Sequence, residues 1–245
     1  FWYALESWAV RRANLVIAAN HERAALMQSH YRLKRMPTVI RNIPPAIARG
    51  AALTHLAPPP PGVTRLIYQG DVSLDRGVGR FVEAVAHLGG AFELVIVGGG
   101  PDLGAVDELR HRLNAGDRIR LLGRVPASDL PALMASAHLG VVCYPTSGLN
   151  NVYCAPNKLY EYAQAGIPMV ATPNRVVDAV FAAYGVGVSG EDVVSCIRAA
   201  VTSRELLIAN IPRFLAENTW TDEASVLVDA YRCLLGDPAG KERAR

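Results

Sequence analysis

Three neighbouring residues bring an amide, a cation and a carboxylate to the start of one expected helix. Asn157 opens a segment that is expected to be helical, Lys158 adds a full positive charge at its start, and Glu161 follows Asn157 by one helical turn. A cation can hold a phosphate group, and a carboxylate can accept hydrogen bonds from sugar hydroxyls, so this set would fit a nucleotide-sugar ligand. The alternative is that Lys158 and Glu161 are solvated residues of a surface helix, and these residues alone leave both interpretations open.

The elements around these residues are typical of a ligand site in an α/β protein. An apolar run at 139–144 predicts a buried strand, and the polar stretch 145–156 predicts a loop. A short helix is expected at 157–165, ended by Gly166. In open α/β sheets the ligand lies beyond the carboxyl end of a strand, where a helix N-terminus favours an anion.

Strands and helices alternate from residue 64 to residue 201, which predicts right-handed βαβ units and a parallel sheet covered on both faces. The strands are continuous apolar runs, as doubly buried strands are. We therefore predict an α/β fold with a Rossmann-like, doubly wound parallel sheet. Strands are expected at 65–69, 92–97, 118–122, 139–144, 169–171 and 186–188, and helices at 78–88, between 101 and 115, and at 129–137, 157–165, 176–184 and 191–201.

Three glycine-containing turns follow strands of this sheet, and each has two interpretations. The turn 98–101 lacks the spacing of a dinucleotide fingerprint, so a tight strand-to-helix turn is favoured over a phosphate cradle. In the turn 70–77, Arg76 could hold a diphosphate bidentately, or it could be a surface arginine at a helix start. The turn 123–125 could present backbone groups to a flat base, or it could be an ordinary loop.

Composition and charge exclude several classes of protein. The chain has 245 residues and a net charge of +3, which is too small to indicate nucleic-acid binding. The arginine excess suits anionic small ligands, or anionic lipid at the inner face of a membrane. No apolar run reaches the ~20 residues that a membrane span needs, and no signal peptide is found. The four cysteines form no CxxC pair and predict reduced thiols of a cytoplasmic protein, and the six histidines lack metal-ligand spacing.

A proline-rich stretch marks the best domain boundary. Because the chain lacks an initiator Met and begins inside an expected helix, it is expected to be a fragment of a longer protein. The sequence predicts an N-terminal piece at 1–45 with helices at 1–13 and 21–30 and strands at 14–19 and 37–42, a linker at 46–63, the sheet domain at 64–203, helices at 204–235 and a flexible tail at 236–245.

Four motifs in this order resemble the donor-binding, C-terminal half of the retaining GT-B glycosyltransferases of glycosyltransferase family 4. They are Gly70-Asp-Val-Ser-Leu-Asp-Arg-Gly77, Ile96-Val-Gly-Gly-Gly-Pro101, Leu121-Leu-Gly-Arg-Val125 and Glu161-Tyr-Ala-Gln-Ala-Gly-Ile-Pro-Met-Val-Ala-Thr172. The opening residues also resemble the end of the family's N-terminal domain. The resemblance covers residues 1–235, and it implies that residues 1–45 are a remnant of the acceptor-side domain to which the helices at 204–235 cross back.

The resemblance implies a glycosyltransferase of the hexosyltransferase type. It would move a sugar, with retention, from a nucleotide-sugar donor to an unidentified acceptor in bacterial polysaccharide, glycan or glycolipid synthesis. It implies neither a metal nor another cofactor. Because the acceptor would bind mostly to the N-terminal domain, this chain alone is expected to bind the donor without turning over.

The resemblance also implies roles for individual residues. The charge of the leaving nucleoside diphosphate would be stabilised by Arg76, Lys158 and the helix N-terminus at Asn157, and Glu161 would contact the ribose. The residues implied in donor binding are Gly70, Asp71, Gly98, Gly99, Arg124, Val125, Tyr144, Pro156, Asn157 and Leu159.

Two departures from the family pattern keep other functions open. The first of the family's two glutamates falls at Tyr153, and the arginine of its first turn is Asp71. Both departures favour a non-catalytic nucleotide-sugar-binding or partner subunit. A GT-B-type sugar-nucleotide epimerase is a further alternative. If the departures mark a subfamily, Lys158 would supply the missing positive charge.

The two ends of the chain carry complementary aromatic residues. Phe1, Trp2, Tyr3 and Trp8 cluster on a segment too short to build a core alone. The final helices carry Phe214, Trp220, Leu227 and Tyr231. We expect residues 205–235 to pack partly against residues 1–43, and the incomplete core to leave an apolar patch exposed.

Overall fold

A computed structural model describes residues 2–46, 56–145 and 147–236 of the chain. The chain divides into two compact units, one made of Phe1–Pro45 with Asn218–Arg245 and the other of Ala46–Glu217. Residues 47–55, which are half of the linker predicted at 46–63, and all but the first residue of the tail predicted at 236–245 lie outside the described residues.

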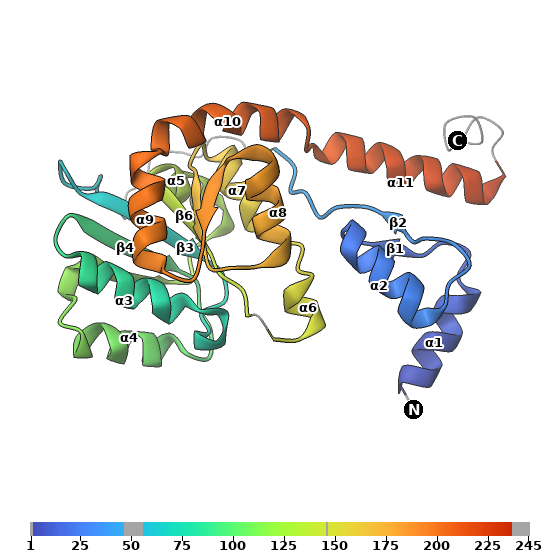
Figure 1. The fold of residues 1–245 in the computed structure, drawn as a ribbon, viewed down its shortest axis with the longest axis horizontal. Helices are drawn as coiled ribbons and strands as arrows, with labels where there is room; N and C mark the ends of the chain where they lie inside the picture. Colours follow the sequence, from blue (N-terminus) through green and yellow to red (C-terminus); the bar gives the residue numbers. More distant parts are fainter. Residues whose placement is uncertain (1, 47–55, 146, 237–245) are drawn as a thin grey trace. The chain divides into compact units, whose positions relative to one another are not determined.

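The larger unit is built on a six-stranded parallel sheet (Figure 1). Every neighbouring pair of strands is parallel, and the strand order is β5-β4-β3-β6-β7-β8. The order therefore reverses between β3 and β6, which is where doubly wound sheets bind their ligands. The strands are β3 (Thr64–Gln69), β4 (Phe92–Val97), β5 (Ile119–Gly123), β6 (Leu139–Val142), β7 (Met169–Ala171) and β8 (Gly187–Ser189).

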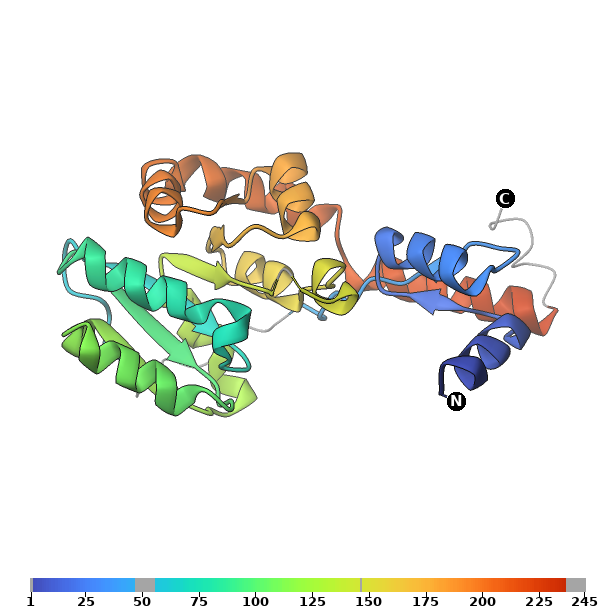
Figure 2. The same cartoon turned by 60° about the horizontal axis from the view of Figure 1, so that its bottom comes forward.

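Helices cover both faces of this sheet and bury two apolar clusters against it (Figures 1 and 2). One face carries α3 (Val78–Leu88), α4 (Leu103–Arg112) and α9 (Val193–Thr202). The other carries α5 (Leu130–Ala135), α7 (Asn157–Gln164) and α8 (Arg175–Tyr184), and α10 (Arg204–Ala216) contributes to both clusters. The predicted α/β class with a doubly wound parallel sheet is confirmed.

Individual elements depart from the predictions where local chemistry, not periodicity, sets the boundary. The expected loop 145–156 contains a short helix, α6 (Leu149–Val152), and the predicted strand 139–144 ends at Val142. The helical region 204–235 is broken: Thr219 is the N-cap of α11 (Trp220–Leu235), and its side chain accepts a hydrogen bond from the Asp222 N–H. Of that region, α10 packs on α7, α8 and α9, and residues from Asn218 onward group with the N-terminal unit.

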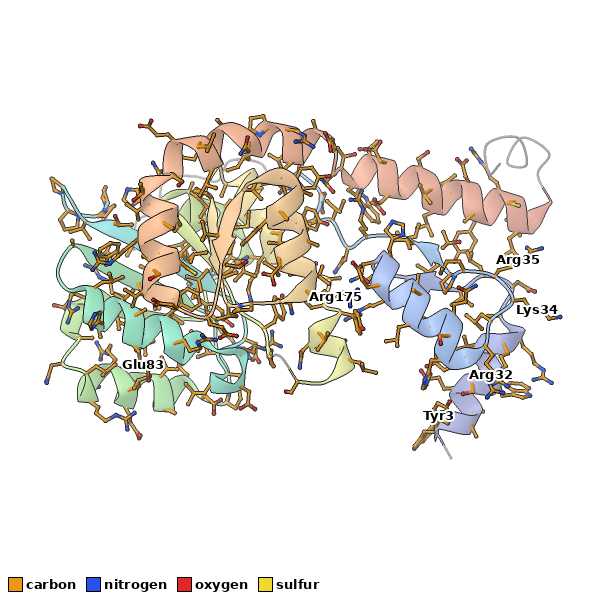
Figure 3. The ribbon with its side chains drawn as sticks, viewed as in Figure 1. Tyr3, Arg32, Lys34, Arg35, Glu83 and Arg175 are labelled. Atoms are coloured by element: carbon orange, nitrogen blue, oxygen red, sulfur yellow. The ribbon has the colours of Figure 1, made fainter. Side chains whose placement is uncertain are left out.

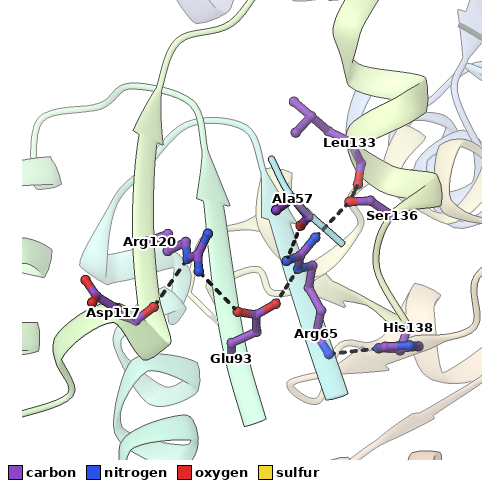
Figure 4. A network of polar contacts seen from close by, with 8 residues as sticks. All are labelled: Ala57, Arg65, Glu93, Asp117, Arg120, Leu133, Ser136 and His138. Carbon is purple, nitrogen blue, oxygen red and sulfur yellow. Dashed lines mark hydrogen bonds and ion pairs between the residues drawn. The ribbon is translucent and has the colours of Figure 1, made fainter. Parts of the chain in front are cut away.

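A buried ion-pair network ties the amino-terminal edge of the sheet together (Figure 4). Arg65 is fully buried, and its Nε lies 2.5 Å from a Glu93 carboxylate oxygen. Its Nη2 donates to the Ala57 carbonyl at 2.8 Å, and its backbone N–H donates to Nδ1 of His138 at 2.9 Å. Burial lowers the pKa of His138, which is consistent with a neutral ring accepting at Nδ1. Arg65 therefore fixes the end of the predicted linker against β3.

The smaller unit contains two short parallel strands, β1 (Ile17–Ala18) and β2 (Thr38–Val39), with α1 (Trp2–Arg12), α2 (His21–Tyr31) and α11. Both strands are shorter than predicted. Asn20 is the N-cap of α2, because its side chain accepts a hydrogen bond from the Arg23 N–H at 2.8 Å. Arg32, Lys34 and Arg35 lie on the exposed segment between α2 and β2 (Figure 3).

Arg41, in the segment after β2, is hydrogen-bonded to Glu223 of α11. The Glu223 carboxylate accepts from the Arg41 backbone N–H at 2.6 Å and from its Nε at 2.7 Å. Trp2, Tyr3, Leu5 and Trp8 of α1 remain exposed. Among the described residues, no helix is long and apolar enough to cross a lipid bilayer.

Candidate functional site

The candidate site lies at the carboxyl ends of β3 and β6, on either side of the point where the strand order reverses. Gly70 follows β3, Tyr144 follows β6, and α7 begins after the loop that leaves β6. The Lys158 side chain from α7 reaches the β3 side: a Cβ added at Gly70 would lie 3.1 Å from its Nζ. The absence of a side chain at Gly70 therefore makes room for the ammonium group.

Lys158 is buried between aromatic rings. The alternative interpretation, that it is a solvated residue of a surface helix, is therefore wrong. Only 7% of the residue is exposed, and its Nζ lies 4.7 Å from the centre of the Tyr68 ring and 5.4 Å from that of Tyr144. Such cation–π contacts are attractive. Burial lowers the pKa of Lys158, with the Arg76 charge acting in the same direction and Glu161 opposing it.

Arg76 ends a short 3₁₀ turn, Leu74–Arg76, just before α3. Its Nε lies 3.7 Å from a carboxylate oxygen of Asp71, and both side chains are partly exposed. This distance is long for an ion pair, and exposed pairs contribute little to stability. The Asp71 carbonyl also accepts a hydrogen bond from the Tyr68 hydroxyl at 2.6 Å, which fixes the start of the turn.

Glu161 is half-buried and faces the end of β3. Its Oε2 accepts a hydrogen bond from the Gln69 side-chain amide. Burial raises the pKa of Glu161 above its usual range, whereas Lys158 and the Gln69 hydrogen bond pull it down. The three charged residues that the sequence singled out are thus brought to one edge of the sheet.

The glycine turn after β4 packs on the turn after β3. A Cβ at Gly98 would lie 1.9 Å from the Gly70 carbonyl oxygen, and one at Gly100 would lie 2.2 Å from that of Val72. The Val72 N–H donates to the Gly99 carbonyl at 3.0 Å. The structure therefore gives Gly98 and Gly100 a clear packing role, in agreement with the tight-turn interpretation.

The remaining predicted site residues are placed less centrally. Arg124 is exposed and its Nε would lie 2.8 Å from a Cβ at Gly99, and Val125 is half-buried against the core. Pro156 is buried at the N-cap of α7, where no side chain caps the helix, and Asn157 is half-buried as its first residue. Leu159 points into the core at 1% exposure, and its N–H bonds to the Pro156 carbonyl at 3.3 Å.

The loop that carries Tyr153 is held by α8. The Cys154 thiol lies 3.5 Å from the Asn174 side-chain oxygen, and the Asn174 amide donates to the Asn151 carbonyl at 3.0 Å. The guanidinium of Arg175, labelled in Figure 3, lies 5.9 Å from the centre of the Tyr153 ring. The Tyr153 ring thus lies near a cation.

Sequence reasoning missed Tyr68, Gln69 and Tyr162 as parts of this site. Gln69 carried the only available signal, because it is a polar residue at the carboxyl end of an otherwise apolar strand. The rings of Tyr68 and Tyr162 read as core residues, and both are in fact fully buried. Within the described residues, no cluster of three or more His, Cys, Asp or Glu side chains could hold a metal ion.

Comparison with known proteins gives the family. The model of the family described as "Glycosyl transferases group 1" matches residues 64–203, which is more than half of the chain and contains all the site residues above. No curated protein sequence matches the chain.

Solved structures give the fold. Anabaena HepE in complex with UDP and glucose has a TM-score of 0.74 at 15% identity, over 94% of this chain and 66% of that one. The corresponding values for sucrose-phosphate synthase from Thermosynechococcus elongatus are 0.70, 19%, 96% and 61%. For WaaG, a glycosyltransferase involved in lipopolysaccharide biosynthesis, they are 0.64, 19%, 86% and 60%.

The chain thus spans slightly less than two thirds of the length of these three structures, and its sheet unit corresponds to the C-terminal half of the GT-B fold. A family match over the whole sheet domain, together with this fold, is decisive. The chain belongs to the group 1 glycosyl transferases, the retaining GT-B family 4.

Proposed function

We propose that the edge formed by β3, β6 and α7 binds a nucleoside-diphosphate sugar, and that the protein of which this chain is part transfers the sugar to an acceptor with retention. The observation that carries the proposal is the meeting of Arg76, Lys158 and Glu161 at the switch point of a group 1 domain. HepE is similar in fold and has been solved with UDP-glucose, which supports a donor of this class.

The chemistry follows from the charges. When the bond from the anomeric carbon to the diphosphate breaks, negative charge builds up on the leaving oxygens. The Lys158 ammonium, the Arg76 guanidinium and the uncapped N-terminus of α7 supply positive charge and N–H donors that are already in place. Glu161 accepts hydrogen bonds from the ribose, and no step requires a metal ion.

The acceptor is proposed only by class. Because the chain covers 66% of the length of HepE, the acceptor-binding residues are expected to lie largely outside this chain. We propose a glycan, lipid or polysaccharide precursor as the acceptor, in the cytoplasm or at the inner face of a membrane. The four free cysteines, three of them buried, support the reducing compartment.

A second function, a nucleotide-sugar-binding subunit without turnover, is favoured by one specific contact. Asp71 places a carboxylate 3.7 Å from Arg76, so it offsets part of the positive charge that a diphosphate would meet. Turnover by the full-length polypeptide with a panel of donors separates the two functions. Release of nucleoside diphosphate with transfer of the sugar supports the transferase, and binding without release supports the subunit.

Donor binding itself is tested by thermal unfolding with UDP-, GDP-, ADP- and dTDP-sugars. A ligand at 100 times its dissociation constant stabilises the fold by ~2.7 kcal/mol, which is easily measured. We expect one base to stand out, and Arg76→Ala to reduce its effect. Arg112→Ala, which removes an exposed arginine at the end of α4, is the matched control. If no nucleotide sugar raises the unfolding temperature, the proposal fails.

A further inference from the structure

Gln69 is the last residue of β3, and it is held by two consecutive residues of α7. Its side-chain amide donates to Glu161, and its backbone N–H donates to the Tyr162 hydroxyl at 3.2 Å. Gln69 is 6% exposed, so the amide is shielded from competing water. A buried amide that reaches a half-buried carboxylate restricts the directions in which that carboxylate can turn.

The Tyr162 side of this arrangement is rigid. Tyr162 is fully buried, and its hydroxyl lies 3.1 Å from the Ile67 carbonyl and 3.3 Å from the Val141 carbonyl, to which it can donate its single proton. It therefore links β3, β6 and α7 at the point where the strand order reverses. Its ring fits because position 140 is glycine, where a Cβ would lie 2.4 Å from the ring atoms.

We propose that Gln69 is a positioning residue that orients the Glu161 carboxylate toward the vicinal diol of the nucleotide's ribose, and that the Tyr162 hydroxyl holds Gln69 in place for this task. This inference rests on the proposed function. A carboxylate has about four lone-pair directions. The Gln69 hydrogen bond occupies one of them and leaves acceptors for two ribose hydroxyls.

The neighbouring charges do not replace Gln69 in this role. Lys158, on the same helix, is directed between the Tyr68 and Tyr144 rings, and Arg76 pairs with Asp71. Three effects shift the pKa of Glu161: its burial, the Lys158 charge and the Gln69 hydrogen bond. Of these, only Gln69 makes a directional contact with the carboxylate.

The first test compares UDP with 2′,3′-dideoxy-UDP, which lacks the diol, by calorimetry; GDP or ADP and their dideoxy forms are used if the wild type prefers that base. Gln69→Met keeps the length of the side chain and removes its donor. We expect it to weaken UDP binding roughly tenfold, about 1.4 kcal/mol, and to leave dideoxy-UDP binding within about twofold. An unchanged ratio of the two affinities in a variant that binds both would overturn the proposal.

Two further variants separate positioning from general damage to the fold. Tyr162→Phe keeps the buried ring and removes only the hydroxyl, so it should reduce the UDP preference in the same direction. Tyr184→Phe is the control, because the Tyr184 ring packs on Phe214 at the opposite end of α8 from the site loop. Equal losses for both ligands in Tyr162→Phe would indicate a structural role only.

The second test begins with the protein free of ligand. The Glu161 carboxyl is titrated by NMR in the free wild type and in Gln69→Met. Because the Gln69 hydrogen bond favours the ionised form, its removal should raise the Glu161 pKa and shift nucleotide binding to higher pH. An unchanged pKa overturns the role of Gln69. Failure of the wild type to bind any nucleotide, with the pKa shift present, would instead overturn the proposed function.

Discussion

The Lys158 ammonium group lies 4.7 Å from the centre of the Tyr68 ring, at the carboxyl ends of the sheet strands. No carboxylate of the described residues forms an ion pair with it, so its charge is balanced only by ring faces and by more distant groups. Burying a charge without a close counter-ion is costly. An anionic ligand would relieve this cost, which is why Lys158 is a candidate for diphosphate binding.

The first prediction concerns Lys158 and Arg76 together. Lys158→Met and Arg76→Ala should each reduce affinity for a nucleoside diphosphate far more than affinity for the nucleoside. If both contact one diphosphate, the double variant should lose less than the sum of the single losses, by ~0.5–3 kcal/mol. Calorimetry with UDP and uridine measures this. Equal losses for UDP and uridine would mean that the two cations only support the loop.

The second prediction concerns Glu161 and separates stability from binding. Its folded-state pKa is raised, so the folded protein binds more protons than the unfolded chain between the usual Glu pKa and the raised value. Its contribution to stability therefore falls as pH rises through that range and stays unfavourable at neutral pH. Glu161→Gln should raise the unfolding temperature of the free protein at pH 7 and weaken nucleotide binding. A variant that melts below the wild type at pH 7 would contradict this.

The third prediction concerns the buried pair Arg65–Glu93 (Figure 4). Arg65→Met leaves a buried carboxylate without its main partner, and such losses cost about 3–5 kcal/mol. Arg120→Met is the control, because its 4.0 Å contact with Glu93 comes from a side chain that is 40% exposed. That control should cost under about 1 kcal/mol. Urea unfolding curves measure the loss of unfolding free energy in each variant. Similar losses for both variants would contradict the main role given to Arg65.

The fourth prediction compares two glycines. A methyl group at Gly140 would strike the Tyr162 ring, so Gly140→Ala should destabilise the fold by at least the ~1–3 kcal/mol typical of overpacking. Gly104, inside α4, has open space where a Cβ would lie. Gly104→Ala should therefore stabilise the protein by roughly 0.5–1 kcal/mol. Opposite signs in thermal unfolding are expected, and the same sign would refute the prediction.

The fifth prediction concerns the smaller unit. The rings of Trp2, Tyr3 and Trp8 on α1 are all exposed, so the isolated chain should self-associate. The double variant Trp2→Lys/Trp8→Glu should sediment more as a monomer than the wild type does. Trp220→Glu, on α11, is the comparison variant. A wild-type chain that sediments as a monomer at high concentration would contradict this prediction.

Much of the fold could be read from the sequence because its strands and helices have strong, regular patterns. The predicted bounds of α3, β4 and β7 match the structure residue for residue. The helix α6 could not be read, because four residues without apolar periodicity carry no helical signal. The break before α11 was also missed, although Thr219 three residues before Asp222 is a recognisable cap.

The sequence predicted the charged residues of the candidate site. It did not predict the contacts that hold them in place. Arg76 lies in a strand-to-helix turn, and Lys158 and Glu161 lie in the first half of the helix after another such turn. The topology of the sheet brings such turns to one edge. The hydrogen bond between Gln69 and Glu161 joins residues 92 positions apart, and no local pattern announces it. The burial of Lys158 likewise depends on two residues far apart in the sequence, Tyr68 in β3 and Tyr144 after β6.

The contact between Gly98 and Gly70 limits how this protein can be engineered. Any side chain at Gly98 would collide with the Gly70 carbonyl, so a change there displaces the turn that carries Arg76. Mutant libraries meant to keep the fold should therefore leave both glycines unchanged. A substitution in one of these turns therefore has to be accommodated by a shift of the other.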